Sequence, residues 1–516
     1  MSLIDLIDNG LNRAPHRPCL IDKNGTYLHG EVRELSHRVA NGLRAQGLER
    51  GSRVAILSPN VAPALVALIG ILRAGAVWLP VQVRNALDEN VEFLAENACE
   101  YLFFHSSFAQ EAEAVRSRVA GLKGMVCLDA SAAGAASFHE WVAGYPGTFP
   151  DEAHNGEDPA WVKSTGGTTG KPKSVVICQR NVETLLATFH LCMPLADPHV
   201  NLAAAPVTHG AGNIALCIIF GGGTVVLIDR AEPNAVLEAI ETHRVTTVFL
   251  PPTVIYSLLA MDGVRERRPP TLKYLISAGA PISAQKLAEA IEVFGPVMVQ
   301  AWGQTEAPFI CTYLGPDDLA SDDPDLRERR LKSCGRSSPL TRVEIMDDDG
   351  ALLPAHSVGE MVVRGNLVML GYRDRPEENE AVSRFGWHHT GDVGYRDDDG
   401  YFYIVDRKKD MIISGGFNIY PSEVEQVLWR HPDVLDCAVI GVPDPKWGEA
   451  LKAVIELKPG RSATEDELKH HCRAALGGMK TPKTVEFWPS LPRSEFGKVL
   501  KRQIRERYWA GHDRRI

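Results

Sequence analysis

The chain has 516 residues, of which 45% are hydrophobic and 23% charged, and its formal net charge is −10. This composition is typical of a soluble globular protein, and the length exceeds what one hydrophobic core usually organises, so we expect two or more domains. The acidic balance disfavours a general nucleic-acid or membrane-surface binder.

The charge is distributed unevenly along the chain. Residues 473–516 hold eleven Lys or Arg against four Asp or Glu. A basic terminus of this kind suits a phosphorylated ligand, and it suits a solvated basic helix over residues 498–507 equally well.

The ten cysteines stand singly, without paired or His-rich spacing, which disfavours a disulfide framework and a zinc site. The N-terminus has no signal-peptide pattern. The most apolar stretches, residues 61–72 and 214–228, are too short or too interrupted by glycine to span a bilayer. We therefore expect a cytoplasmic protein with no integral membrane segment.

Residues 232–302 alternate between β-rich runs and helical periodicity, a pattern that predicts an α/β fold around a parallel sheet. Ser283 is the expected N-cap of the helix between the last two strands. Ligands bind beyond the carboxyl ends of such strands, which here read SAGAP (277–281) and AWGQTEAP (301–308). The expected strands are 245–250, 274–277 and 297–300.

After residue 330 the sequence predicts β-hairpins. Two DDDG runs, 347–350 and 397–400, end in the Asp-Gly pair that tight turns favour, and we expect turns there rather than a metal site. The charged DRKKD segment (406–410) is either a solvated turn or an interdomain joint. The remaining residues suffice for a small, separate α+β domain of roughly a hundred residues.

The segment KSTGGTTGKPKS (163–174) is rich in glycine, hydroxyl and lysine residues. It is not a P-loop, because Thr165 stands where the first glycine is required and Pro172 where a Ser or Thr is required. Glycines let backbone amides approach an oxyanion, hydroxyls donate hydrogen bonds, and lysine supplies charge. The segment therefore predicts a phosphate cradle, with a flexible linker as the alternative.

The chain contains five short motifs in the following order: STGGTTGKPKS (164–174), WGQTE (302–306), HHTGD (388–392), YIVDRKKDMIISGG (403–416) and RSEFGKVLK (493–501). Together they resemble the motifs of the adenylate-forming superfamily, which includes acyl-CoA synthetases, non-ribosomal adenylation domains and luciferases. The resemblance runs from about residue 25 to residue 502. The chain departs from the usual pattern at Gly166, where Ser is common, and at Ser174, where Gly is common; we expect altered kinetics from these changes.

The resemblance implies an adenylation domain over residues 1–405, built of parallel-rich α/β subdomains and a β-hairpin subdomain. A small mobile α+β domain over residues 406–516 would rotate about Asp406. It also implies a reaction: a carboxylic acid and ATP with Mg²⁺ give an acyl-adenylate and pyrophosphate, and coenzyme A then gives acyl-CoA and AMP.

The resemblance further implies a role for each motif residue. Glu306 and Thr165 would bind Mg²⁺, Thr305 and Lys498 would contact the α-phosphate, and His209 would shape the acid pocket or act as a structural histidine. The phosphates of ATP would be held by Ser164, Thr165, Gly166, Gly167, Thr168, Thr169, Gly170 and Lys173. The adenosine and its ribose would be held by Gly279, Ala280, Pro281, Gln300, Trp302, Gly303, Gln304, Asp392 and Arg407.

For the thioester step, the resemblance places Ser414, Gly415 and Gly416 along the pantetheine arm, since glycines allow close passage. Candidates for the nucleotide end of coenzyme A are Trp447, Arg473 and Lys480, for which surface packing is the alternative.

The acid would lie against residues 206–213, 250–256, 277–280 and Ala301, which are rich in small side chains. We expect a medium- to long-chain fatty acid or an aromatic acid. The alternatives are an enzyme that loads an acyl-carrier protein and a nucleotide-binding homologue without activity. No nucleic-acid partner is expected, and a homodimer is left open.

Overall fold

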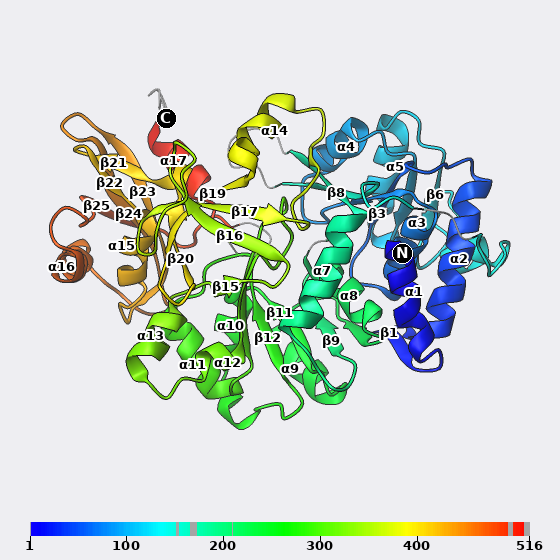
Figure 1. Cartoon of the computed structure of the whole chain (residues 1–516), viewed down its shortest axis with the longest axis horizontal. Coiled ribbons are helices and arrows are strands. Elements are labelled where there is room, and N and C mark those ends of the chain that lie inside the picture. The colour runs from blue at the N-terminus through cyan, green and yellow to red at the C-terminus, as the bar shows by residue number, and fades with distance from the viewer. Residues whose placement is uncertain (1, 151–153, 166–172, 209, 494–498, 510–516) are drawn as a thin grey trace.

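The structure is a computed structural model that describes residues 2–150, 154–165, 173–208, 210–493 and 499–509 (Figure 1). Over these residues the named strands form four sheets, of nine, seven, five and four strands.

The seven-stranded sheet has a parallel centre, in which β3, β4, β5, β6 and β7 run side by side, and antiparallel β8 and β18 at one edge. In order across the sheet, its strands are β18 (Gly371–Tyr372), β8 (Ser174–Cys178), β7 (Pro159–Ser164), β4 (Val77–Pro80), β3 (Arg53–Leu57), β5 (Tyr101–Phe104) and β6 (Gly124–Cys127).

The nine-stranded sheet is likewise parallel at its centre and antiparallel at both edges. In order, its strands are β15 (Arg336–Ser337), β14 (Thr312–Leu314), β13 (Met298–Trp302), β12 (Tyr274–Ser277), β11 (Thr247–Leu250), β9 (Val200–Ala203), β10 (Thr224–Leu227), β1 (Pro18–Asp22) and β2 (Gly25–Leu28).

The two smaller sheets follow later in the chain. The four-stranded sheet is antiparallel and contains β16 (Thr341–Met346), β17 (Gly359–Gly365), β19 (His388–Arg396) and β20 (Phe402–Arg407). The five-stranded sheet contains β22 (Phe417–Ile419), β21 (Ile412–Ser414), β24 (Gly448–Leu457), β23 (Val434–Asp444) and β25 (Thr484–Phe487).

Helices connect the parallel strands and cover the sheets. The helices are α1 (Leu3–Arg13), α2 (His29–Ala45), α3 (Ala62–Arg73), α4 (Leu87–Glu96), α5 (Ala109–Arg118), α6 (Phe138–Ala143), α7 (Gln179–Cys192), α8 (Gly210–Phe220), α9 (Pro233–Thr242), α10 (Pro252–Leu259), α11 (Ala284–Phe294), α12 (Pro316–Leu319), α13 (Pro324–Leu331), α14 (Pro376–Val382), α15 (Pro421–Leu428), α16 (Glu465–Leu476) and α17 (Lys501–Trp509).

The largest hydrophobic core joins the two large sheets. It contains Val54 of β3 and Val225 of β10, together with Leu65 of α3 and Ile218 of α8. Every residue of α3 is buried, and all except its last residue, Arg73, are apolar; such a helix is expected inside a core rather than on a surface. The central strands are continuous apolar runs because both of their faces are covered.

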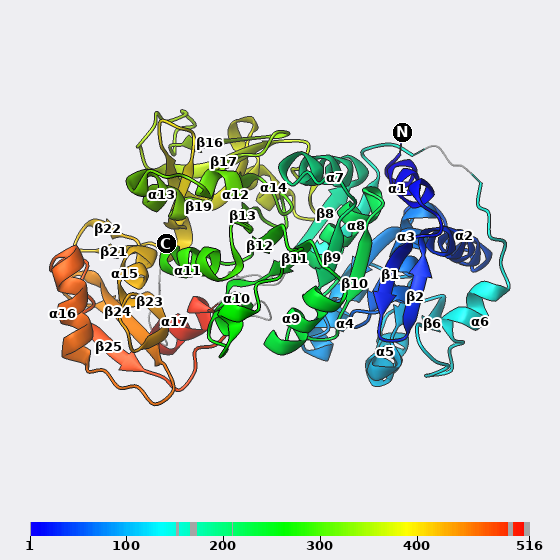
Figure 2. The same ribbon diagram turned by 90° about the horizontal axis from the view of Figure 1, so that it is seen from below.

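The segment after β20 forms a separate layer at one end of the molecule, opposite the N-terminal helices (Figures 1 and 2). Its sheet packs with α15 and α16 around a hydrophobic cluster of its own. The fold is therefore α/β, with a large N-terminal part and a small C-terminal part, as the sequence predicts. The domain boundary at residue 406 stays a prediction.

Most of the expected local elements are present. The three predicted strands are β11, β12 and β13, and the Ser283 side chain accepts a hydrogen bond from the backbone of Lys286 at the start of α11. Both DDDG runs form turns, each closed by a backbone hydrogen bond from the glycine to the first aspartate. Among the described helices, none combines the length and apolar character that a bilayer span requires.

Candidate active site

The predicted phosphate loop begins and ends on a pair of antiparallel strands. Ser164 of β7 lies opposite Ser174 of β8. The backbone N–H of Thr165 donates to the carbonyl of Lys173 at 2.9 Å, and the Thr165 hydroxyl accepts from the Lys173 N–H at 3.2 Å. Residues 166–170 of the predicted site lie outside the described residues. The strand pair fixes the two ends of the loop, Thr165 and Lys173, close together.

Ser174, which departs from the family pattern, has a structural partner. Its hydroxyl accepts a hydrogen bond from Nδ2 of Asn97 at 2.9 Å, and Asn97 is buried at the end of α4. Oδ1 of Asn97 accepts from the Arg373 side chain at 3.4 Å. The backbone N–H of Arg373 donates to the backbone carbonyl of Ser174 at 2.9 Å. The Ser174 side chain therefore anchors the loop stem to α4.

Two predicted nucleotide-binding segments leave the nine-stranded sheet side by side. Strands β12 and β13 are parallel neighbours, with Ser277 opposite Gln300. Gly279 follows β12 with φ of 84°, a conformation that glycine adopts without strain, and Ala280 and Pro281 complete the turn. Because both strands end at one edge, residues 279–281 and 300–306 share one end of the sheet.

The predicted ribose acceptor Asp392 is buried and fully engaged. The Trp302 indole donates to its Oδ2 at 2.9 Å, and the Gln304 amide lies 3.3 Å from the same atom. Arg407 lies on the other side, with Nε 3.2 Å from Oδ1. A buried carboxylate is stable when it is paired and hydrogen-bonded, as here. Three predicted site residues thus meet at one carboxylate.

Trp302 itself is 8% exposed and packs in the core with Ala307 and Phe402. Its indole nitrogen is committed to Asp392, so the ring is held at a fixed angle beside the ribose acceptor. Contact between this ring and adenine stays a prediction, as does a contact between Gln300 and the base edge. Gln300 lies 3.5 Å from the Ser333 carbonyl.

Glu306 lies at the opposite end of the same segment from Trp302. The Tyr372 hydroxyl donates to Glu306 Oε1 at 2.8 Å, and the Met369 N–H donates to the Glu306 backbone carbonyl at 2.8 Å. The Tyr372 ring lies under the ammonium group of Lys173, 4.6 Å from its centroid. Thus the structure brings Glu306 and the loop lysine together through a tyrosine that lies outside the five motifs.

The donor set around Glu306 fits a magnesium ion bound jointly with ATP. Magnesium prefers oxygen ligands and commonly takes one or two carboxylates together with substrate phosphates. Within the described ranges, no Lys or Arg forms an ion pair with Glu306, and only Tyr372 hydrogen-bonds its carboxylate. Among the described residues, no partner therefore occupies Oε2, which would be free to bind a metal. The Thr165 hydroxyl, at the loop stem, is the second predicted ligand.

The predicted hinge residue Asp406 joins β20 to the C-terminal segment. Neighbouring residues of a strand face opposite sides, so Arg407 faces Asp392 while Asp406 faces α15. Asp406 accepts from the Ser422 N–H at 2.8 Å, in the first turn of α15. A carboxylate at a helix N-terminus satisfies free N–H groups and favours the helix dipole. The hinge aspartate is thus tied to the segment it would move.

Next to this hinge lies a buried ion pair. Lys501 of α17 is 2.8 Å from Glu425 of α15, and the Glu425 carboxylate also accepts from the Val439 N–H at 2.6 Å. Burial raises the pKa of Glu425 to about 7, whereas the positive charge of Lys501 opposes that rise. The pair fixes the start of α17, three residues after Lys498.

The predicted thioester segment is a tight hairpin turn between β21 and β22. Gly415 and Gly416 have φ of 58° and 81°, and the Gly415 N–H donates to the Trp447 carbonyl at 2.8 Å. A Cβ on Gly415 would lie 2.7 Å from the Trp447 ring. The structure therefore brings Trp447 beside this turn. Lys480, by contrast, forms an ion pair with Glu423 at 2.6 Å.

Part of the predicted acid-binding wall gathers in one hydrophobic cluster. Ala211, Ala278 and Ala301 are buried in the core between the large sheets, together with Phe249 and the partly buried Phe309. The two phenylalanine rings meet edge to face at 6.2 Å. Three alanines and two aromatic rings suit a flat apolar group.

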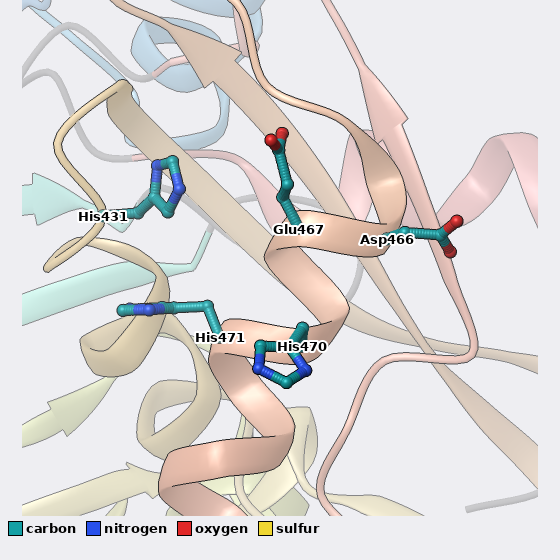
Figure 3. A pocket seen from close by; sticks show the side chains of 5 residues that line it. All are labelled: His431, Asp466, Glu467, His470 and His471. Carbon is teal, nitrogen blue, oxygen red and sulfur yellow. The ribbon is translucent and has the colours of Figure 1, made fainter.

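A surface hollow in the C-terminal part is unrelated to this chemistry. It is lined by His431, Asp466, Glu467, His470 and His471 (Figure 3). His431 and His471 lie side by side, but Asp466 and His470 point to other sides of α16 (Figure 3). Glu467 caps its own helix through Thr464. Over the described residues, no group of three or more His, Cys, Asp or Glu side chains could hold a metal ion.

His209 and Lys498 lie outside the described residues, so their roles stay predictions. Sequence reasoning missed Tyr372, Asn97 and Lys163. Asn97 and Tyr372 touch the predicted site only through contacts between distant segments, so no local signal could have identified them. Lys163 directly precedes the loop motif, and its charged side chain within a buried strand was an available signal.

Comparison with known proteins identifies the family of the chain. The AMP-binding enzyme family model matches residues 7–373, and the model of the AMP-binding enzyme C-terminal domain matches residues 423–498. A feruloyl-CoA synthase from Amycolatopsis sp is 37% identical over 497 residues, which cover 96% of each chain. An indoleacetate–CoA ligase from Aromatoleum aromaticum is 31% identical over 510 residues, or 98% of each chain.

Among solved structures, the amide bond synthetase McbA from Marinactinospora thermotolerans has a TM-score of 0.89 and 31% identity, over 98% of this chain and 99% of that chain. Family models cover most of the sequence, and the full-length relatives above exceed 30% identity. The chain therefore belongs to the AMP-binding enzymes of the adenylate-forming superfamily, as an AMP-forming acid–CoA ligase.

Proposed function

We propose that this ligase uses ATP with Mg²⁺ to convert an aromatic carboxylic acid into its acyl-adenylate and then transfers the acyl group to coenzyme A. The two products of the first step are the adenylate and pyrophosphate, and those of the second are acyl-CoA and AMP. A medium- to long-chain fatty acid is the other substrate class that the sequence predicts.

One observation carries the proposal. The five residues from Trp302 to Glu306 contact the ribose acceptor Asp392 at one end and, through Tyr372, the loop lysine Lys173 at the other. A nucleotide laid along this segment would have its ribose at Asp392 and its phosphates at the loop. Its α-phosphate would then lie between them, near Thr305.

In the first step a carboxylate oxygen attacks the α-phosphorus, and the bond to the bridging oxygen of pyrophosphate breaks. Negative charge gathers on the phosphate oxygens, so preorganised donors and cations provide the catalysis. Lys173 and the loop amides would bind the leaving pyrophosphate, while Lys498 and Thr305 would contact the α-phosphate. Magnesium, when bound at Glu306, would neutralise phosphate charge.

In the second step the thiol sulfur of coenzyme A attacks the acyl carbon, the bond to the AMP oxygen breaks, and the thiol proton leaves to solvent. The Gly415–Gly416 turn would border the pantetheine arm, because glycines place no side chains in its path. Rotation about Asp406 would exchange Lys498 for this turn. One hinge thus would serve both steps.

The aromatic class is favoured by the wall of Ala211, Ala278 and Ala301 with the Phe249 and Phe309 ring pair. Small side chains leave width for a ring, and an edge-to-face pair of phenylalanines offers a ring surface to stack against. The aromatic substrates named for the feruloyl and indoleacetate relatives are consistent with this choice.

The test is a panel of acids containing cinnamates, arylacetates, octanoate and palmitate. Each would be scored by acid-dependent ATP–pyrophosphate exchange and by coenzyme A-dependent AMP release. We expect cinnamates or arylacetates to give the highest kcat/KM. A preference for palmitate would overturn the aromatic assignment. Release of AMP only with an acyl-carrier protein would overturn coenzyme A as the acceptor. If none of the acids supports ATP–pyrophosphate exchange, the proposed activity is wrong.

A further inference from the structure

We propose that Tyr372 is a positioning residue for pyrophosphate release, which holds the magnesium-binding Glu306 and the phosphate-binding Lys173 in one arrangement. The proposal rests on the function proposed above. Tyr372 is assigned no contact with substrate. Its role would be exercised through the two side chains that it touches.

The two contacts of Tyr372 are made by different parts of its side chain. The hydroxyl donates to Glu306 Oε1 at 2.8 Å, and the face of the ring lies 4.6 Å from Lys173 Nζ. A cation over an aromatic face is attracted by the ring quadrupole. The two contacts can therefore be removed separately, since phenylalanine keeps the ring and loses the donor.

Tyr372 is itself held firmly by its backbone. It is 7% exposed and pairs with Val175 across β18 and β8, so it is attached to the strand that follows Lys173. The Asn379 side chain forms two hydrogen bonds with the Tyr372 backbone: it accepts from the N–H at 2.6 Å and donates to the carbonyl at 2.8 Å. A side chain fixed in this way can impose its geometry on its partners.

The hydrogen bond from Tyr372 also fixes the orientation of the Glu306 carboxylate. An ionised carboxylate only accepts hydrogen bonds, so the Tyr372 hydroxyl is the donor to Oε1. With Oε1 held in this way, the carboxylate would present Oε2 to a metal. Residues that orient a metal ligand commonly change metal affinity or activity 10- to 100-fold when mutated.

Glu306 is tied to the same segment a second time, through the hydrogen bond from the Met369 N–H to its backbone carbonyl. The segment 369–372, which ends in β18, thus fixes the Glu306 backbone through Met369 and its carboxylate through Tyr372. Since β18 also pairs with β8, the positions of the metal ligand and the phosphate loop are coupled through one short strand. Movement of either would have to involve Tyr372.

The experiment compares Tyr372→Phe and Tyr372→Leu with the wild type. ATP binding is measured by calorimetry without acid, over a series of Mg²⁺ concentrations and in EDTA. We expect Tyr372→Phe to raise the half-saturating Mg²⁺ about tenfold while ATP affinity in EDTA stays within about twofold. Tyr372→Leu should additionally weaken ATP binding in EDTA about two- to fivefold, because it removes the aromatic ring that contacts the Lys173 ammonium group.

Tyr403→Phe is the matched control. Tyr403 is buried to the same degree, and its hydroxyl donates to the carboxylate of Asp397 at 2.8 Å, away from the residues of the candidate site. We expect no change in Mg²⁺ dependence for this variant. Thioester formation from supplied acyl-adenylate and coenzyme A should also be unchanged in Tyr372→Phe, since it releases no pyrophosphate.

Two outcomes would overturn the proposal: wild-type Mg²⁺ dependence in Tyr372→Phe, or a loss of ATP affinity in EDTA as large as the loss with Mg²⁺. The second would mean that Tyr372 only supports the fold. If the wild type activates no acid, the proposed function fails, and the binding series still decides the role of Tyr372.

Discussion

The buried lysine Lys163 should make the free energy of unfolding of the chain depend on pH. It is 5% exposed on β7, donates to Asn213 Oδ1 at 2.7 Å, and lies 4.9 Å and 5.3 Å from the ring centroids of Trp161 and Trp78. Among the described residues, no carboxylate forms an ion pair with it. Burial lowers the pKa of Lys163 to about 7.

The sign follows from the two protonation states. The pKa of Lys163 is about 7 in the native state and about 10.4 in the unfolded state, so unfolding takes up a proton between these values. The free energy of unfolding should therefore rise with pH through that window. Below pH 7 both states are protonated and the full penalty of burying the charge is present.

The magnitude follows from the same shift. One proton contributes about 1.4 kcal/mol per pH unit, so the gain in stability from Lys163 between pH 6 and pH 9 should be roughly 2 to 3 kcal/mol. Other groups also titrate in this range. The difference between wild type and Lys163→Met isolates the lysine, because methionine nearly conserves volume and cannot titrate.

Urea unfolding at pH 6, 7, 8 and 9, followed by tryptophan fluorescence, measures this difference, since Trp78 and Trp161 flank the lysine. We expect the wild type to gain roughly 2 to 3 kcal/mol relative to Lys163→Met across the series. Lys273→Met, at an exposed lysine, is the control for the loss of a lysine at the surface. Parallel curves for wild type and Lys163→Met would refute the reasoning.

Three further substitutions test the candidate site. Asp392→Asn removes the charge that faces Arg407 and should weaken ATP binding about 10- to 100-fold by calorimetry, and an unchanged affinity would contradict a ribose-binding role. Gly415→Ala places a Cβ 2.7 Å from the Trp447 ring and should slow thioester formation at least about tenfold while sparing ATP–pyrophosphate exchange. Lys498→Ala should abolish that exchange and largely spare thioester formation from supplied acyl-adenylate; equal loss in both assays would argue against the hinge.

Local rules predicted much of the fold. The strands β11 and β12 are apolar runs, as inner strands of a parallel sheet covered on both faces should be. Ser283 caps α11 by a contact three residues away. The two DDDG turns likewise depend on the residues that form them. Each of these predictions needed only a few consecutive residues.

In the candidate site, too, the sequence predicted individual residues but not the tertiary contacts between them. Trp302 and Asp392 could be selected by their motifs, but the hydrogen bond between them joins residues 90 positions apart and depends on how β13 and β19 pack. The resemblance supplied their expected roles without supplying this contact. Tyr372 lies outside the quoted motifs, and its contacts with Val175 and Glu306 join segments far apart in the sequence.

The loop stem shows what such tertiary contacts add to a motif. Lys163, Ser174 and Tyr372 lie on three adjacent strands, β7, β8 and β18, and each binds a partner from a different part of the chain, respectively α8, α4 and Glu306. Substitutions at these positions would shift the ends of the loop without removing any phosphate ligand. The Ser174 hydroxyl thus contacts Asn97 in the stem, and the altered kinetics expected from this residue stay a prediction.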